Sequence, residues 1–265
     1  VGTGRIYDLK VYGADSKRLG TFFAEDIPAN GYKTYILTDE SPAQVENSLK
    51  GEEQSNYIEN KWYKVSFDKK KGCIRSIWDK TNKRELVDDR SENGFGSYVY
   101  ERYDKEQSYR YLKEYIYDKY KNSHYQITGK STYLDERTKG IHESPRNMEF
   151  HVENHKSSIR GVLTPSASVG EEKHTAGLTV TLYENMPCID VKLSVINKPA
   201  TEEPEAGWIA LPFKTKSPEY RVGRIGSVID PAKDLIEGSQ FNYIWSNSGI
   251  MIKDKEYSFG VCPID

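Results

Sequence analysis

Acidic and aromatic residues gather between Glu202 and Trp208, in the order Glu202-Glu203-Pro204-Glu205-Ala206-Gly207-Trp208. A carboxylate accepts hydrogen bonds from neighbouring hydroxyl groups, while an indole ring offers a flat apolar face to the C–H groups of a sugar ring. Glu205 and Trp208 are therefore candidate carbohydrate-binding residues. A solvated loop with one packed aromatic residue would explain the same segment without any ligand.

A second group of polar and aromatic residues follows: Asp230, Asn242, Tyr243 and Trp245. Tyr243 and Trp245 are two positions apart, so they would point to the same face of a strand. We predict that these four residues also contact carbohydrate, although packing of the two aromatic residues in the core is the alternative. Exposure of the aromatic residues in both groups would favour binding, and burial of all of them would favour a scaffold.

The histidines are candidate acid and base residues for an alternative, enzymatic function. A sugar epimerase of the mutarotase type needs a general acid and a general base close to the sugar, and His151, His174 and Glu205 are available for these roles. Nothing in their spacing requires them to converge. His151 and His155 would lie about four residue rises apart on one strand, too far to share a metal easily. We expect no metal and no cofactor in this chain.

Alternating apolar residues predict the strands that must position these side chains. The segment from Ile58 to Val87 is typical of a β-hairpin, because Tyr63, Val65 and Phe67 alternate with polar residues and an apolar run from Ile74 to Trp78 returns after Gly72. The same alternation predicts strands at Leu178, Val180 and Leu182, and from Ile189 to Val195, with a turn at Asn185-Met186-Pro187 between them. Long strands at hairpin spacing favour a sandwich of two antiparallel sheets.

The remaining segments predict one short helix and a division into two units. Apolar residues recur at three- and four-residue intervals between Glu101 and Tyr120, which favours a helix with a solvated charged face. Short strands, among them Lys33 to Leu37, predict a small β-unit, and the polar stretch 39–56 reads as a linker. We therefore expect residues 1–55 to form a small β-unit with its linker and residues 56–265 to form the sandwich domain.

Three motifs of this chain resemble the C-terminal region of glycoside hydrolase family 38, the α-mannosidases. The hairpin contains Phe67-Asp68, then Gly72-Cys73-Ile74-Arg75-Ser76-Ile77 and Asp79-Lys80, which are similar to the start of the large β-domain of that family. Pro28-Ala29-Asn30-Gly31-Tyr32 and Tyr35 resemble the strand before that domain, and Ala210-Leu211-Pro212-Phe213 resembles a later strand. The resemblance extends over nearly the whole chain.

This resemblance implies an antiparallel β-supersandwich of the galactose mutarotase-like type. In that family the nucleophilic aspartate and the zinc ligands lie in an N-terminal catalytic domain, and no such region is present here. The chain begins at Val1 rather than methionine, so we expect a piece of a longer polypeptide. The resemblance implies a non-catalytic β-domain, inactive by itself, whose partners are the catalytic domain of the same polypeptide and carbohydrate; a carbohydrate-binding module is the alternative.

Composition excludes several other classes of function. With 38 basic and 40 acidic residues the chain has no basic field, so nucleic acid is not an expected partner. The three cysteines, Cys73, Cys188 and Cys262, lack the spacing of a zinc cluster or a disulfide framework. No run of eighteen apolar residues and no signal-like start is present, which predicts a soluble chain without a membrane partner.

Overall fold

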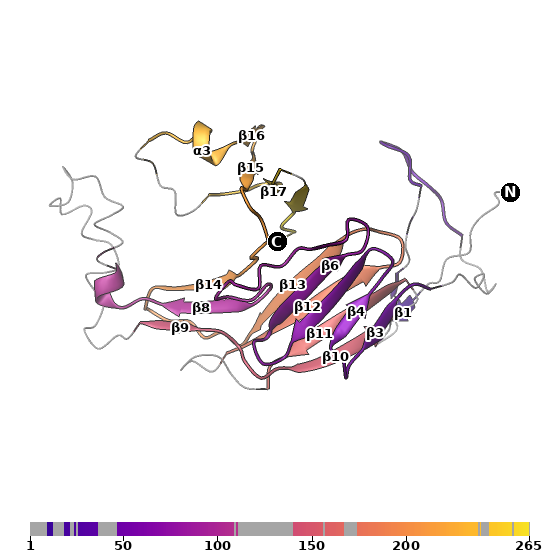
Figure 1. Cartoon of the computed structure of the whole chain (residues 1–265), viewed down its shortest axis with the longest axis horizontal. Coiled ribbons are helices and arrows are strands. Elements are labelled where there is room, and N and C mark those ends of the chain that lie inside the picture. Colours follow the sequence, from indigo (N-terminus) through magenta and orange to yellow (C-terminus); the bar gives the residue numbers. More distant parts are fainter. Residues whose placement is uncertain are drawn as a thin grey trace.

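The computed structural model of the 265-residue chain describes residues 10–12, 19–21, 24, 26–36, 47–108, 110, 140–155, 157–166, 174–237, 239, 244–255 and 257–264. Antiparallel β-sheet dominates these residues, as predicted. Two sheets face each other and enclose the main core, and a three-stranded and a further four-stranded sheet lie beside them (Figure 1). Among the described helices, none combines the length and the apolar character that crossing a membrane would require.

The first facing sheet is a meander of five strands. It contains β3 (Lys50–Glu52), β4 (Tyr57–Glu59), β5 (Tyr63–Asp68), β6 (Cys73–Asp79) and β7 (Arg84–Glu85), in this order. The predicted hairpin is confirmed, since β5 pairs with β6 and Gly72 has a positive φ of 64° in the turn between them. Asp79 Oδ1 then accepts hydrogen bonds from the amides of Thr81 and Asn82, which fixes the second turn.

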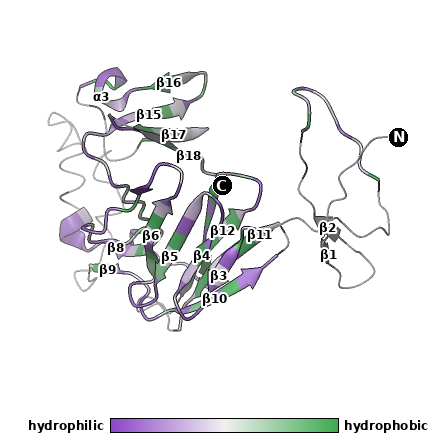
Figure 2. Ribbon diagram, turned by 45° about the vertical axis from the view of Figure 1, so that its right-hand side comes forward, coloured by the Kyte–Doolittle hydropathy of each residue, from purple (hydrophilic) through white to green (hydrophobic). Residues whose placement is uncertain are grey.

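The second facing sheet also follows chain order. It contains β10 (Glu149–Asn154), β11 (Ser158–Thr164), β12 (Thr175–Tyr183) and β13 (Ile189–Ile196). The two strands predicted around Leu178 and Ile189 are therefore confirmed, and they pair with each other in an antiparallel hairpin. Figure 2 shows that hydrophobic and hydrophilic residues alternate along the strands of both facing sheets, as a half-buried sheet requires.

The core between these sheets is closely packed. Ile58, Val65, Ile159 and Leu163 are fully buried in it. The approach is closest at Gly161, where an added Cβ would lie 2.6 Å from Cζ of Phe67 and 3.0 Å from Cε2 of Phe150. Glycine at this position thus lets the two phenylalanine rings cross the interface between the sheets, with their centroids 4.6 Å apart.

A three-stranded sheet continues from the sandwich and carries the residues discussed below. β8 (Tyr98–Arg102) lies in its centre, between β14 (Glu205–Ile209) and β9 (Ile141–Glu143). One face of β8 is anchored by Tyr98 and Tyr100, which are buried against Ala176 of β12. The opposite face of the sheet carries exposed side chains, Trp208 and His142 among them, beside the buried Val99.

The C-terminal segment forms a further four-stranded sheet, in the order β16 (Ser227–Ile229), β15 (Glu219–Arg224), β17 (Gly249–Lys253) and β18 (Ser258–Val261). The short helix α3 (Pro231–Asp234) follows β16. Phe259 of β18 stacks on Phe213 at a centroid distance of 4.5 Å, and Phe213 contacts Phe95 edge-on. This aromatic column joins the C-terminal sheet to the sandwich core.

Two expectations about the first sixty residues need correction. Residues 33–36 form no strand, since Tyr32 and Ile36 are each 87% exposed and this segment pairs with no described sheet. Among the described residues, the small unit contains only β1 (Lys10–Tyr12) and β2 (Leu19–Thr21). β3 lies within the predicted linker yet pairs with β4, so the sandwich begins before residue 56. The remaining division into two units stays a prediction.

The helix predicted between Glu101 and Tyr120 is wrong at its first residues, and most of its remaining length lies outside the described residues. Glu101 and Arg102 belong to β8, residues 105–108 are helical, and residues 109 and 111–139 lie outside the described residues. Within the part of the chain that the structure describes, two short helical segments are therefore seen, residues 105–108 and α3.

Candidate carbohydrate-contact site

Trp208 lies on the solvent-facing side of the three-stranded sheet and is fixed to a carboxylate of the neighbouring strand. Its side chain is 42% exposed, and its indole N–H donates a hydrogen bond to Glu101 Oε2 at 2.8 Å. The strand register explains this contact, because Ala206 lies opposite Glu101 and Trp208 lies opposite Val99, which places the indole and the carboxylate on the same face.

Two more side chains converge on the same carboxylate. Tyr103 donates its hydroxyl to Glu101 Oε2 at 2.7 Å, and His142, directly across the β8–β9 pair, places Nδ1 3.0 Å from Oε1. Since a carboxylate only accepts, His142 carries a proton on Nδ1. We call Glu101, Tyr103, His142 and Trp208 the Glu101 cluster.

The electrostatics of the Glu101 cluster favour an ionised Glu101. Partial burial raises the pKa of Glu101, but hydrogen bonds from Tyr103, Trp208 and His142 outweigh this effect and hold the pKa below its ordinary value. The cluster therefore presents a carboxylate and an indole ring in a fixed relative orientation on a rigid sheet. Such preorganised polar and aromatic groups suit a hydroxyl-rich ring, since little side-chain freedom remains to be lost on binding.

Glu205 does not join this cluster, although the sequence places it beside Trp208. The two residues are three positions apart on β14, and side chains at an odd spacing on a strand point to opposite faces. Glu205 instead accepts a hydrogen bond from Tyr100 Oη at 2.9 Å and forms an ion pair with Lys198 Nζ at 2.7 Å. The predicted carboxylate thus lies behind the sheet, and Glu101 occupies the position beside the indole that the sequence suggested for Glu205.

The second predicted group is only partly described. Asn242 and Tyr243 lie outside the described residues, and Trp245 is 77% exposed. Asp230 forms ion pairs with Arg221 at 3.0 Å and Lys233 at 3.3 Å and accepts a hydrogen bond from the first turn of α3. Asp230 and Trp245 are therefore not brought next to Trp208 by any described contact.

The residues available to a sugar epimerase are separated by burial. His174 is 0% exposed and lies behind β8, with Nε2 3.2 Å from Tyr98 Oη, so it cannot touch a sugar in solvent. His151 lies on β10, beside Glu53 and Glu149. Within the described ranges, no group of three His, Cys, Asp or Glu side chains is placed to hold a metal ion.

The fold and the site together define the class of protein, an antiparallel β-sandwich whose lateral sheet exposes a fixed indole and carboxylate. Residues 58–262 match the family model described as the glycosyl hydrolases family 38 C-terminal domain, and the chain therefore belongs to this family. The matched range includes the whole Glu101 cluster. Among curated protein sequences, none matches the chain significantly.

Proposed function

We propose that this chain is the non-catalytic C-terminal β-domain of an α-mannosidase-like glycoside hydrolase, where it supports the catalytic domain and lines the carbohydrate cleft with the Glu101 cluster. The contact between the exposed indole of Trp208 and Glu101 is the observation that supports a place for this site in the carbohydrate cleft. In this proposal the catalytic acid, the nucleophile and the zinc ion belong to the catalytic domain. The chain by itself is expected to be inactive toward mannosides.

The role of the Glu101 cluster in this proposal is to hold a sugar, not to transfer a proton. A pyranose ring would place its C–H groups over the exposed part of the Trp208 indole. The Glu101 carboxylate, already ionised, would accept a hydrogen bond from a hydroxyl group at the edge of that ring, and the half-exposed His142 would flank it. The two anchoring bonds from Tyr103 and Trp208 keep the carboxylate in place while it binds.

Exposed apolar side chains of the C-terminal sheet support the packing part of the proposal. Large apolar residues that are exposed gather in its strands and connections: Ile225 at 87%, Val228 at 69%, Ile236 at 82%, Trp245 at 77% and Met251 at 43%. Exposed apolar side chains of this size leave water when a protein partner covers them, which favours association. In this proposal the catalytic domain of the same polypeptide covers part of them.

The test compares the full-length parent protein with this chain, each with added zinc, on an aryl α-mannoside and on an α-linked mannotriose. We expect the parent to hydrolyse both substrates and this chain to hydrolyse neither. Trp208→Ala in the parent should lower kcat/KM for the trisaccharide about tenfold, since one aromatic contact is worth roughly 1 kcal/mol or more.

Trp78→Ala is the matched control for this substitution, because Trp78 is similarly exposed at 40% but lies on β6 of another sheet. The control should leave kcat/KM unchanged. Equal effects of the two substitutions would contradict the proposal that the Glu101 cluster lines the cleft. Hydrolysis by the isolated chain would contradict the assignment of the chemistry to another domain.

A carbohydrate-binding module remains the second candidate, favoured by the exposure of both described candidate tryptophans, Trp208 and Trp245. In that case calorimetry would detect binding of mannotriose to the isolated chain. If the parent protein were also inactive toward mannosides, carbohydrate binding would be the function of the domain.

A further inference from the structure

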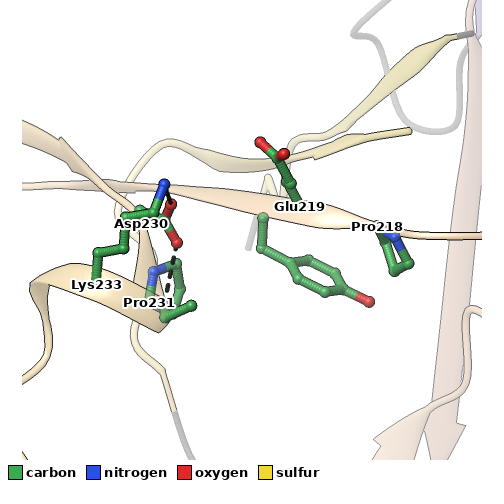
Figure 3. A pocket seen from close by; sticks show the side chains of 7 residues that line it. Pro218, Glu219, Asp230, Pro231 and Lys233 are labelled. Atoms are coloured by element: carbon green, nitrogen blue, oxygen red, sulfur yellow. Dashed lines mark hydrogen bonds and ion pairs between the residues drawn. The ribbon is translucent and has the colours of Figure 1, made fainter. Parts of the chain in front are cut away.

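A pocket of about 370 Å³ lies between β15 and α3, on the C-terminal sheet and apart from the Glu101 cluster. Its lining consists of Pro218, Glu219, Tyr220, Asp230, Pro231, Ala232 and Lys233. Figure 3 shows Pro218 at one end of the pocket and Pro231, with Asp230 and Lys233, at the other. This volume is at the lower end of the range of small-molecule sites, which fits a single ring better than a folded partner.

The aromatic surface of the pocket is the ring of Tyr220. Tyr220 is 45% exposed, while its cross-strand partner Ile252 is 9% exposed. The Glu219 carboxylate points away from Pro218 and Pro231 in Figure 3, and Arg221 Nη2 lies 3.4 Å from it. The floor of the pocket is therefore apolar, formed by one aromatic ring and two proline rings.

Hydrogen bonds and an ion pair fix the walls of the pocket in the absence of a ligand. Asp230 caps α3 through its bond from the Ala232 amide, and its own amide donates to Asp234 Oδ2 at 2.7 Å. The ion pair between Asp230 Oδ2 and Arg221 Nη1, at 3.0 Å, then ties α3 to β15. Two proline rings with fixed φ angles leave the rims little freedom. A preformed pocket of this kind loses little entropy when it binds.

Polar groups are concentrated at one end of the pocket. The Lys233 side chain is 73% exposed, and its ammonium group makes an ion pair with Asp230 at 3.3 Å. An ammonium group has three protons, so Lys233 can donate to a ligand oxygen while it keeps this ion pair. An apolar floor with a cationic donor and a carboxylate at one end matches a ring that has a C–H face and hydroxyl groups at its edge.

We propose that this pocket is a second carbohydrate site, which holds one hexopyranose unit of a glycan against Tyr220, with Lys233 and Asp230 at its hydroxyl groups. The choice of a sugar rests on the proposed function of the domain, but the site itself is separate from the Glu101 cluster. A proline-rich peptide is a poorer match, because such peptides occupy grooves lined by several aromatic residues and this pocket has one. The site would engage a branch of the glycan away from the scissile bond.

The experiment is a titration of the isolated, isotope-labelled chain with mannotriose, followed by amide and indole chemical shifts. We expect the amides of Tyr220, Ala232 and Lys233 to shift with a common dissociation constant. Tyr220→Ala should weaken this binding about tenfold, Tyr220→Phe should keep it within about twofold, and Lys233→Ala should weaken it about threefold. Tyr32→Ala, at a tyrosine that is 87% exposed, is the control and should change nothing.

Three outcomes overturn the inference: no shift in the pocket at tens of millimolar sugar, unchanged affinity in Tyr220→Ala, or an equal loss in Tyr32→Ala. Shifts of the Trp208 indole without shifts in the pocket would reject this site and leave the proposed function standing. Shifts in the pocket without those of Trp208 would support this site and count against the Glu101 cluster. Because the shift map uses the unmodified chain, the proposal stays testable even if a variant does not fold.

Discussion

Glu101→Gln tests whether one carboxylate holds Tyr103, His142 and Trp208 together. A carboxylate accepts all three hydrogen bonds, while a glutamine amide has one acceptor oxygen and turns an N–H₂ group toward one of the three donors. A hydrogen bond to a charged group contributes about 1.5–3 kcal/mol, against about 0.5–1.5 kcal/mol for a neutral pair. Since Trp208 and His142 are half exposed, we expect a total loss of about 1–2 kcal/mol.

Urea unfolding of the two proteins measures this loss, and indole N–H resonances report on Trp208 directly. Glu143→Gln is the matched control, because Glu143 is an exposed glutamate on β9, next to His142. We expect the control to stay within about 0.5 kcal/mol of the parent chain and to leave the Trp208 resonance in place. Equal stability of the two variants, together with an unmoved Trp208 indole resonance, would refute the reasoning.

The pH dependence of the same comparison follows from the lowered pKa of Glu101. A carboxyl group whose pKa is lower in the folded chain than in the unfolded chain stabilises the fold fully above its unfolded pKa, near the ordinary value of 4.5. This contribution is lost as the pH falls through the folded pKa. The difference in unfolding free energy between the parent chain and Glu101→Gln should therefore shrink as the pH falls below about 4.

Three further predictions concern the sandwich. Asn60→Ala should cost about 2–4 kcal/mol, because this fully buried amide makes three hydrogen bonds to backbone groups, and urea unfolding should place the exposed control Asn154→Ala within about 0.5 kcal/mol of the parent chain. Gly161→Ala should cost about 1–3 kcal/mol, since the new methyl group would lie 2.6 Å from a buried phenylalanine ring; an unchanged Tm would contradict the packing argument. Burial raises the pKa of Cys73 to about 11, so iodoacetamide at pH 8 should modify the exposed Cys262 first, and mass spectrometry would detect the reverse order.

The strands of the sandwich could be predicted because their two faces differ. Along β12 and β13 the apolar residues follow the period of a strand, and the register pairs Leu178 with Leu193 and Val180 with Val191. A pattern of this kind depends only on which side chains are buried, which the sequence records directly. The same argument explains why residues 33–36 were assigned wrongly, since their apolar residues have no described partner and remain exposed.

The helix predicted from Glu101 failed at its first residues for a different reason. The recurrence of apolar residues at three- and four-residue intervals predicts a helix between Glu101 and Tyr120, although Tyr98 and Tyr100 also fit a strand. Tertiary packing decides between the two, because both tyrosines bury their rings against Ala176. As a result Glu101, which was assigned to a solvated helical face, is the residue on which the Glu101 cluster converges.

The error at Glu205 identifies the information that a single sequence lacks. The sequence alone located Trp208 as a residue suited to sugars, and the parity of a strand would have excluded Glu205 as its partner had β14 been predicted. Parity does not supply the correct partner, however, because Glu101 precedes Trp208 by 107 residues and meets it only when β14 pairs with β8. Aromatic residues can therefore be found within a segment, but the carboxylate that completes such a site depends on which strands become neighbours. For this domain the register between β8 and β14 determines whether Trp208 is a loosely packed surface residue or an indole fixed to the Glu101 carboxylate.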